Sequence, residues 1–368
     1  DNRVLAEGIT FTNFVANVTG TADALAALLL GIEPLPTTLV QNDLLQRFPP
    51  RCEEFTSLGA NQDHQGACER NLICLSKRNG YRTIFLTNAP FTFGKTKSWL
   101  EGLGFDQMED DASESLKHLP RYTFGSPADT ALYARALEVA AANQEPFLMV
   151  LLTVSLHTPY QLPDPKYQIS SDPKLNLLNY VDDTTADFYD GLKKTDFLDN
   201  GVFLLVGDHR RMTPFEPEEI AEKGVDASGR VVAGLIGAGI DPGHYERAPF
   251  NHTDLATILG RMVQGVPLGA TDLRCYQKGL LLGLDHYFTT SLMSKGYLRL
   301  LARTQHEHFI VPLGRELAPE DFADEVQRKI ASYVALSSDW LARRRSQCGS
   351  DSGFAGQSGI VSPQIPSR

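Results

Sequence analysis

Two adjacent residues that follow an apolar segment are of the types that bind divalent cations. Residues 201–209 read GVFLLVGDH, so an apolar run between two glycines leads directly into Asp208 and His209. The run is too short for a helix and is typical of a buried strand in a parallel sheet. Ligands of open α/β sheets bind just outside the carboxyl ends of the strands, and a carboxylate beside an imidazole suits Zn²⁺ or Mn²⁺. The alternative is an ordinary loop whose first residue is a capping Asp.

A hydroxyl group near the beginning of the chain offers a nucleophile for such a site. Thr21 precedes an Ala/Leu-rich run, residues 22–30, which predicts a helix with Thr21 at its N-cap. Most capping threonines are structural. The same place also favours a bound phosphate, because unpaired amides and the helix dipole contribute about 0.3–2 kcal/mol there. Thr21 would need a cation or a base nearby to attack at neutral pH.

Two other apolar segments are followed by polar candidates. Residues 147–154 (FLMVLLTV) predict a central strand, and His157 follows it at the sheet edge expected for Asp208. Residues 81–86 (YRTIFL) predict another strand, with Asn88 in the loop after it. A histidine in such a loop is usually structural, but beside a metal and phosphate site it becomes a candidate for substrate contact.

The order of the elements predicts the fold class. The apolar patterns predict strands at 81–86, 147–154, 201–207 and 230–236. Helices alternate with them, at 1–7, 22–30, 65–79, 96–102, 127–143 and 175–198 and from residue 252. This alternation predicts an α/β fold, a doubly wound and mostly parallel sheet flanked by helices. We expect a catalytic domain over residues 1–267. A small C-terminal α+β addition should follow over 268–345, with short antiparallel strands in 268–313 and a helix at 319–345, and then a disordered tail over 346–368.

Charge and length limit the partners. The chain has 368 residues and a formal net charge of −11, with no basic stripe, so we expect no nucleic-acid binding and no attachment to an anionic membrane by charge alone. No run approaches the roughly 18 apolar residues of a membrane span, and no signal peptide is visible. The sequence starts inside a predicted helix at Asp1, so we expect a fragment of a longer protein.

Cysteine usage leaves two alternatives open. The chain has five cysteines and no CxxC pair. Cys52, Cys68 and Cys74 are close enough in sequence for a disulfide, which would suit an oxidising compartment. Free thiols are the equally weighted alternative.

Five segments in a fixed order resemble a known family. These are LAEGITFTNFVANVTGTADALAALLLGIEPLP, NGYRTIFLTN, LLTVSLHTPY, LLVGDH and APFNHTDLATILG. Together they resemble the sulfatase-like branch of the alkaline phosphatase superfamily, with lipoteichoic acid synthases and bacterial phosphoglycerol transferases nearest. The resemblance covers roughly residues 1–266.

The resemblance implies roles by position. Thr21 matches the threonine that attacks phosphorus, carries a covalent phospho-intermediate and contacts the metal. Asp208 and His209 match two metal ligands, the metal being Mn²⁺, Zn²⁺ or Mg²⁺. His157 matches the histidine that contacts the substrate phosphate or the leaving group. His252 lies where some relatives place another metal-binding or substrate-binding histidine.

Two departures from the family pattern qualify these roles, and a third difference separates the chain from arylsulfatases. The family's first metal ligand, usually Glu, follows an N-terminal strand that would lie before residue 1, and the lack of that strand would leave its neighbours exposed. The arginine expected after the YRTIFL strand is missing, so Lys95 or Lys97 would have to bind the substrate phosphate as a point charge. Residues 21–25 read TADAL rather than C/S-x-P-x-R, so formylglycine chemistry is not supported.

The resemblance therefore implies a metal-dependent phosphotransferase or phosphodiesterase whose donor is phosphoglycerol or a similar phospholipid head group. The whole protein would be held in a bacterial inner membrane by helices absent from this chain, with its catalytic domain facing the periplasm or exterior. Two alternatives remain: a sulfuric-ester or phosphate-ester hydrolase on the same fold, and a catalytically inactive sulfatase-like domain.

Overall fold

The computed structural model describes most of the first two thirds of the chain. The described residues are 2–12, 14, 16, 20–31, 71–92, 96–210, 218, 221, 229–245, 250–266, 268, 286–289, 297–302 and 308–312. The chain divides into two units, residues 1–315 and 316–368, and every described residue belongs to the first. The predicted helix at 319–345 and the predicted tail lie outside the described residues, and the predicted domain boundaries stay predictions.

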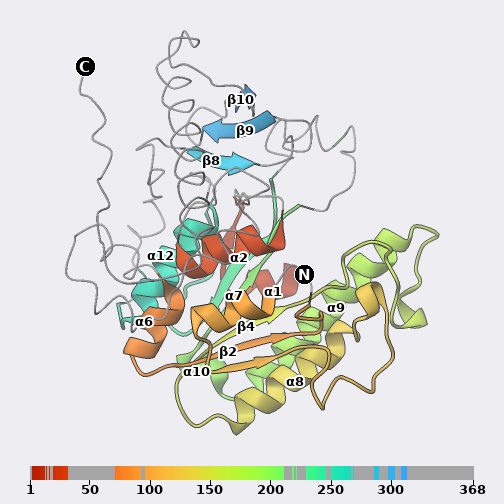
Figure 1. Cartoon of the computed structure of the whole chain (residues 1–368), viewed down its shortest axis with the longest axis horizontal. Coiled ribbons are helices and arrows are strands. Elements are labelled where there is room, and N and C mark those ends of the chain that lie inside the picture. The colour runs from red at the N-terminus through yellow and green to blue at the C-terminus, as the bar shows by residue number, and fades with distance from the viewer. Residues whose placement is uncertain are drawn as a thin grey trace, which may run out of the picture. The chain divides into compact units, whose positions relative to one another are not determined.

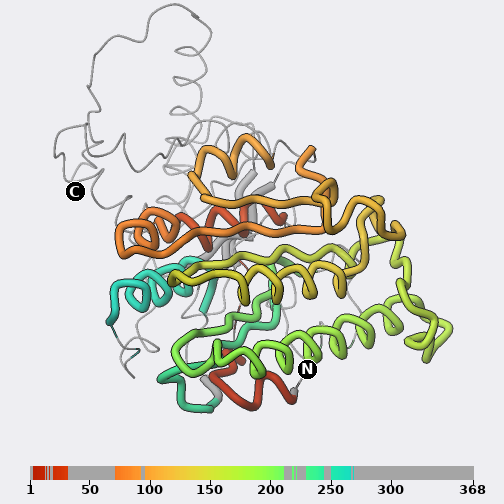
Figure 2. The backbone as a smooth tube through the Cα atoms, turned by 90° about the horizontal axis from the view of Figure 1, so that it is seen from below, coloured from red at the N-terminus to blue at the C-terminus, as the bar shows by residue number. Residues whose placement is uncertain are grey.

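One sheet is parallel throughout, as the sequence predicts. Its strands lie in the order β3-β2-β4, with bounds Gln107–Glu109, Arg82–Thr87 and Phe147–Leu152. Ile84 in the central strand pairs with Gln107 on one side and Met149 on the other. The strands β2 and β4 run side by side in Figure 2. Parallel neighbours need a crossover connection, and α8 (Asp129–Ala142) lies in the segment that joins β2 to β4.

A second sheet is mixed. Its order is β5-β6-β1-β7, with bounds Val202–Val206, Ala233–Gly237, Ile9–Phe11 and Gly243–Tyr245. The strand β6 is antiparallel to β5 and to β1, while β1 and β7 are parallel. The α/β class is confirmed, but β6 departs from the parallel direction that the sequence suggested. The direction of a strand depends on how the chain returns to the sheet, which the apolar pattern of the strand itself does not record.

The helices agree closely with the sequence prediction. They are α1 (Asn2–Ala6), α2 (Thr21–Leu30), α6 (Leu72–Arg78), α7 (Thr96–Leu103), α8, α9 (Pro173–Lys193), α10 (Phe197–Asn200) and α12 (His252–Val263), with short 3₁₀ turns η2 (Thr123–Gly125) and η3 (Pro165–Tyr167). Figure 1 shows their arrangement. The helix predicted over 175–198 is two helices, because Asp196 takes a left-handed conformation with φ 54° between them.

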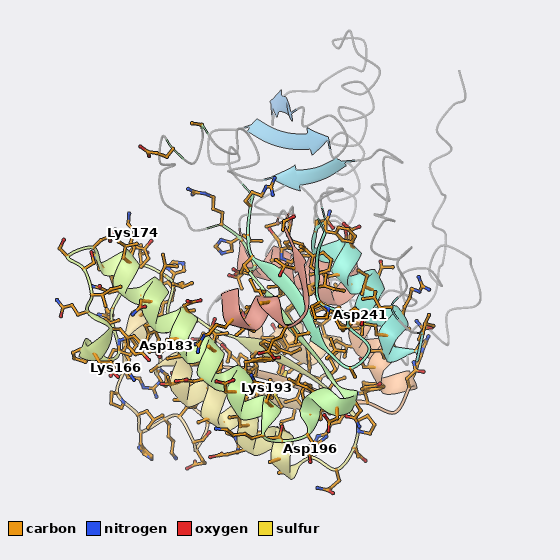
Figure 3. All side chains as sticks on the ribbon, turned by 180° about the vertical axis from the view of Figure 1, so that it is seen from behind. Lys166, Lys174, Asp183, Lys193, Asp196 and Asp241 are labelled. Atoms are coloured by element: carbon orange, nitrogen blue, oxygen red, sulfur yellow. The ribbon has the colours of Figure 1, made fainter. Side chains whose placement is uncertain are left out.

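The longest described helix, α9, is polar on much of its surface. Its 21 residues begin after Asp172, whose side chain accepts from the Lys174 amide. Near its end, Lys193 pairs with Glu7 at 3.2 Å and with Asp190 at 2.8 Å, and Figure 3 labels Lys193 on this helix. In the described part of the chain, no helix is both long enough and apolar enough to cross a membrane.

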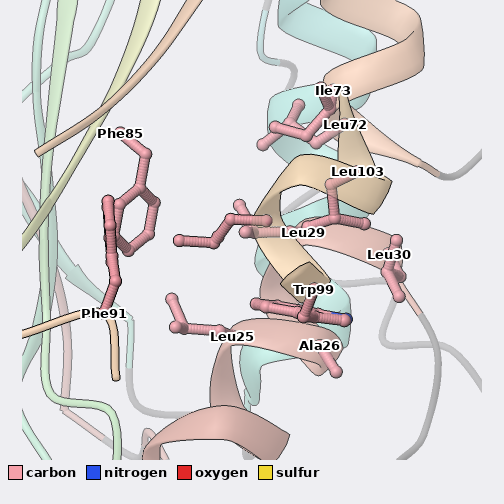
Figure 4. Close-up of a cluster of buried hydrophobic side chains, with 11 residues drawn as sticks. Leu25, Ala26, Leu29, Leu30, Leu72, Ile73, Phe85, Phe91, Trp99 and Leu103 are labelled. Atoms are coloured by element: carbon pink, nitrogen blue, oxygen red, sulfur yellow. The ribbon is translucent and has the colours of Figure 1, made fainter. Parts of the chain in front are cut away.

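Apolar side chains on both faces of β4 hold the helices against the sheet. Leu148, Val150 and Leu152 pack against a cluster built from α2, α6, α7 and β2, and Figure 4 shows Leu25 and Leu29 of this cluster directed towards Phe85 and Phe91. Phe147, Met149 and Leu151 alternate with them and pack against a cluster from α8 and α9. The alternation follows from the two-residue period of a strand. The parallel sheet therefore has helices packed on both of its faces.

The strands β4 and β5 are less buried than β2. Every residue of β4 and of β5 is partly exposed, whereas all of β2 after its first residue is buried. Among the described strands, β4 pairs only with β2 and β5 pairs only with β6.

Three further strands form a separate antiparallel sheet. They are β8 (His286–Thr289), β9 (Tyr297–Ala302) and β10 (His308–Pro312), in the order β10-β9-β8. The prediction of short antiparallel strands in residues 268–313 is confirmed for these segments.

One cysteine distinguishes the two alternatives left by the sequence. Cys74 is fully buried in α6 and is disulfide-bonded, with its partner outside the described residues. The structure therefore favours the disulfide over free thiols at this position.

Candidate active site

Three residues that the sequence predicts to act together do converge. The Thr21 hydroxyl Oγ1 donates to Asp208 Oδ2 over 2.6 Å, although 187 positions separate the two residues. His209 Nε2 lies 3.4 Å from Thr21 Oγ1 and 3.4 Å from Asp208 Oδ2. A hydroxyl, a carboxylate and an imidazole nitrogen thus surround one point at the ends of α2 and β5.

The backbone explains why the Thr21 hydroxyl is available. The N-cap of α2 is Gly20, with extended φ −142° and ψ 141°, and Thr21 is the first residue inside the helix. The prediction that Thr21 is the N-cap is therefore wrong by one position. Because Gly20 holds the capping position, the Thr21 hydroxyl does not cap the helix and bonds to Asp208 instead. The positive end of the helix dipole remains beside it.

Local contacts orient His209. Its Nδ1 lies 2.8 Å from the Arg210 carbonyl oxygen, which can only accept, so Nδ1 carries the proton. In this tautomer of the neutral ring, the lone pair is on Nε2, the atom that faces Thr21 and Asp208. An imidazole whose other nitrogen donates to a carbonyl is the usual form of a metal-binding histidine. The His209 side chain is only 9% exposed, compared with 37% for Asp208.

His252 contacts the backbone next to the site. It opens α12, whose N-cap Asn251 forms a capping box with Asp254. The side chain is buried, and Nε2 lies 3.0 Å from the Gly207 carbonyl oxygen, to which it donates. Burial lowers the pKa of His252 to about 4, so the ring is neutral. The His252 ring thus holds Gly207, the residue that precedes Asp208, and its predicted role in binding metal or substrate stays a prediction.

His157 follows β4 in an exposed loop with unusual backbone. Its ring centroid is 4.3 Å from that of Phe124, and its Nδ1 is 3.2 Å from the Thr158 carbonyl oxygen. The Thr158–Pro159 peptide bond is cis, and Phe124 and Tyr160 both have φ 57°. The described contacts of His157 are with these neighbours rather than with Thr21 or Asp208.

The other predicted substrate contacts have different outcomes. Asn88 is completely buried, and its Nδ2 donates to the Pro127 carbonyl and to Asp129 Oδ1, each over 2.8 Å. The Asn88 amide nitrogen therefore holds the loop, and substrate binding by Asn88 stays a prediction. Lys97 is exposed in the first turn of α7, and Lys95 lies outside the described residues.

The donor set fits a divalent cation. The described residues contain no group of three His, Cys, Asp or Glu side chains that could hold a metal. A cation would depend on Asp208 and His209 Nε2, with the Thr21 hydroxyl as a third ligand. Asp208 and His209 are ligand types found in catalytic zinc sites, whereas the Thr21 hydroxyl is a weaker ligand.

Sequence reasoning missed Asp129. Residues 127–143 predict a helix, and an acidic residue in the first turn of a helix is commonplace. Its partners Asn88 and Val154 are 41 and 25 positions away, so no local pattern could have identified it.

Comparisons with known proteins give the family and the fold. A model of the Sulfatase family matches residues 1–250. The lipoteichoic acid synthase LtaP from Listeria monocytogenes superposes with a TM-score of 0.63 at 18% identity, covering 93% of this chain and 85% of that one. A protein in the alkaline phosphatase superfamily from Vibrio parahaemolyticus gives 0.57 at 20% identity, with 93% and 81% covered. A protein of the glycosaminoglycan-metabolism locus of Bacteroides thetaiotaomicron gives 0.51 at 12% identity, with 82% and 80% covered.

Proposed function

Because the chain belongs to the Sulfatase family and is an enzyme of the sulfatase-like type, we propose that it cleaves phosphodiesters with Thr21 as the nucleophile. The observation that carries this proposal is the convergence of the Thr21 hydroxyl with Asp208 Oδ2 at 2.6 Å and His209 Nε2 at 3.4 Å. A structural threonine at a helix start would bond to its own backbone rather than to a carboxylate and an imidazole far along the chain.

Thr21 Oγ1, an Asp208 carboxylate oxygen and His209 Nε2 would hold a divalent cation, either Mn²⁺, Zn²⁺ or Mg²⁺. When bound, the cation lowers the pKa of the hydroxyl and neutralises charge on the phosphoryl oxygens. Asp208 Oδ2 accepts the hydrogen bond of the Thr21 hydroxyl and so fixes the direction of Oγ1. The first amides of α2 favour the phosphate at the same place.

In the reaction, Thr21 Oγ1 forms a bond to phosphorus while the bond to the leaving alcohol oxygen breaks in line. The hydroxyl proton leaves towards Asp208, and the leaving oxygen takes a proton, for which His157 is the proposed donor. Water or a second alcohol then attacks the phospho-threonine, which restores the Thr21 hydroxyl and releases the phosphate ester. Positioning and charge stabilisation dominate such transfers, and these are what the three residues supply.

Phosphorus rather than sulfur is favoured by the nucleophile itself. Thr21 stands where formylglycine-dependent sulfatases require Cys or Ser, and the TADAL sequence lacks the rest of that pattern.

We propose a glycerophospholipid head group as donor, in keeping with the similarity to a lipoteichoic acid synthase. The disulfide at Cys74 agrees with an oxidising compartment, so we place the domain in the cell envelope, outside the cytoplasm.

The test compares three esters side by side after reconstitution with each metal. We expect turnover of bis(p-nitrophenyl) phosphate above that of p-nitrophenyl phosphate and p-nitrophenyl sulfate, and none by Thr21→Ala. Faster turnover of the sulfate would favour the sulfuric-ester alternative. No turnover of any ester, with Mn²⁺, Zn²⁺ or Mg²⁺ bound, would favour an inactive domain.

A further inference from the structure

A buried carboxylate joins three segments close to the His157 loop. Asp129 is 1% exposed, and its Oδ1 accepts from Asn88 Nδ2 over 2.8 Å and from the Val154 amide over 3.3 Å. Asn88 follows β2, Val154 follows β4, and Asp129 opens α8. One oxygen atom thus connects the loops after two neighbouring parallel strands to the helix between them.

Asp129 is not a helix cap. The N-cap of α8 is Ala128, which makes no side-chain hydrogen bond, and Asp129 is the first residue inside the helix. Its carboxylate is therefore directed at other segments. Burial raises the pKa of Asp129, while donors from Asn88, Ser155 and Val154 oppose that rise. A carboxyl group is costly to bury, and its cost is offset only where its partners stay in place.

The connection continues directly to His157. The Val154 amide donates to Asp129, and the Val154 carbonyl accepts from the His157 amide over 3.1 Å. The His157 carbonyl in turn accepts from the Tyr160 amide over 3.0 Å. A displaced Val154 would therefore move the turn that carries the imidazole.

A second link holds the same two strand ends. Thr87 Oγ1 donates to the Leu152 carbonyl over 2.9 Å and accepts from the Ala89 amide over 3.0 Å. The ends of β2 and β4 are thus held both by Thr87 and by the Asn88–Asp129 pair.

We propose that Asp129 is a positioning residue, whose buried carboxylate sets the place of His157 by holding the Val154 amide and the Asn88 side chain together. The inference rests on the proposed function, in which His157 contacts the substrate. Asp129 touches neither the substrate nor Thr21, and it acts through the loop.

The first test measures the loop without reference to activity. Hydrogen–deuterium exchange of a peptide spanning residues 153–161 should be at least tenfold faster in Asp129→Asn than in the unmodified protein. Asp106→Asn is the matched control, because Asp106 Oδ2 likewise accepts from a neighbouring strand, at Thr83 N and Oγ1, but at the other end of β2. Unchanged exchange at residues 153–161 in folded Asp129→Asn would overturn the proposal. If that variant fails to fold, Ser155→Ala removes one neighbour of the carboxylate and should show the same change to a smaller degree.

The second test separates positioning from general stability. We expect Asp129→Asn to lower kcat/KM for bis(p-nitrophenyl) phosphate about tenfold, but less than twofold when His157→Ala is already present. Equal losses in the two backgrounds would overturn the inference, because Asp129 would then act independently of His157. If His157→Ala retains full activity, the proposed role of His157 is wrong, and the exchange experiment alone decides whether Asp129 holds the loop.

Discussion

The two carboxylates Asp208 and Asp129 have opposite surroundings. Asp208 follows β5 with its side chain 37% exposed, and it accepts from the Thr21 hydroxyl and from the adjacent His209 amide. Asp129 is 1% exposed and accepts from a side-chain amide and a backbone amide. An exposed acid beside a hydroxyl and an imidazole can take part in chemistry, whereas a buried acid among amides can only hold them. Residue type alone does not separate the two.

The largest expected effect concerns Asp208. Asp208→Asn removes the negative charge that holds the cation and orients the Thr21 hydroxyl, so we expect kcat/KM to fall roughly 10⁴-fold or more. Steady-state kinetics with metal analysis of the same samples would measure this. A variant that binds metal and turns over normally would make Asp208 no more than a loop residue and remove the contrast with Asp129.

The second effect is on stability, where the order of the two residues should reverse. Asp129→Ala leaves the buried Asn88 and Val154 donors without their acceptor, so we expect a loss of about 3 kcal/mol in the free energy of unfolding. Asp208→Ala in metal-free protein should cost about 1 kcal/mol or less, because its side chain is partly exposed. Urea denaturation of both variants tests this. Similar losses of stability in the two variants would contradict a catalytic role for Asp208 and a structural role for Asp129.

His252, which holds the residue before Asp208, should make the free energy of unfolding depend on pH. Its pKa is lowered by burial from 6.5 to about 4, so the unfolded state takes up the proton first as pH falls. Stability present above pH 6.5 is then lost progressively down to about pH 4, by about 3 kcal/mol at 1.36 kcal/mol per unit. Denaturation of metal-free protein at pH 7 and pH 4.5 should show a smaller loss in His252→Asn, and equal losses in both proteins would contradict this role.

The smallest expected effect is at Asp106, far from either loop. Lys77 pairs with it at 2.7 Å and Thr83 donates to it, so Asp106→Asn should cost about 1 kcal/mol of stability. Turnover should be unchanged. A clear loss of turnover would mean that general loosening of β2 reaches the site, and it would weaken the specific role given to Asp129.

Much of this fold was predictable because buried strands and amphipathic helices leave patterns within a few residues. The strand predicted at 81–86 is β2, Arg82–Thr87, and the helix predicted at 96–102 is α7, Thr96–Leu103. The antiparallel direction of β6 was not predictable, since it depends on the path of the connecting chain. The break between α9 and α10 depends on the left-handed conformation of one residue, Asp196. Asp can adopt this conformation, but an Asp in the sequence does not by itself predict it.

The site divides in the same way. Thr21, Asp208 and His209 were predicted because each stands at the end of a recognisable element, and the edge of a sheet brings such ends together. Asn88 was predicted to contact substrate for the same reason, because a position at a strand end is typical of ligand-binding residues. Its buried hydrogen bond to Asp129, 41 residues away, could not be predicted from the sequence. Burial decides between the two roles, and burial is a property of the folded chain.

Anomalous diffraction from crystals of the protein grown with Mn²⁺ tests the central claim most directly. The account predicts one strong peak about 2.0–2.3 Å from Thr21 Oγ1, an Asp208 carboxylate oxygen and His209 Nε2. A manganese-saturated crystal with no peak there, and with the 2.6 Å hydrogen bond from Thr21 to Asp208 intact, would contradict it.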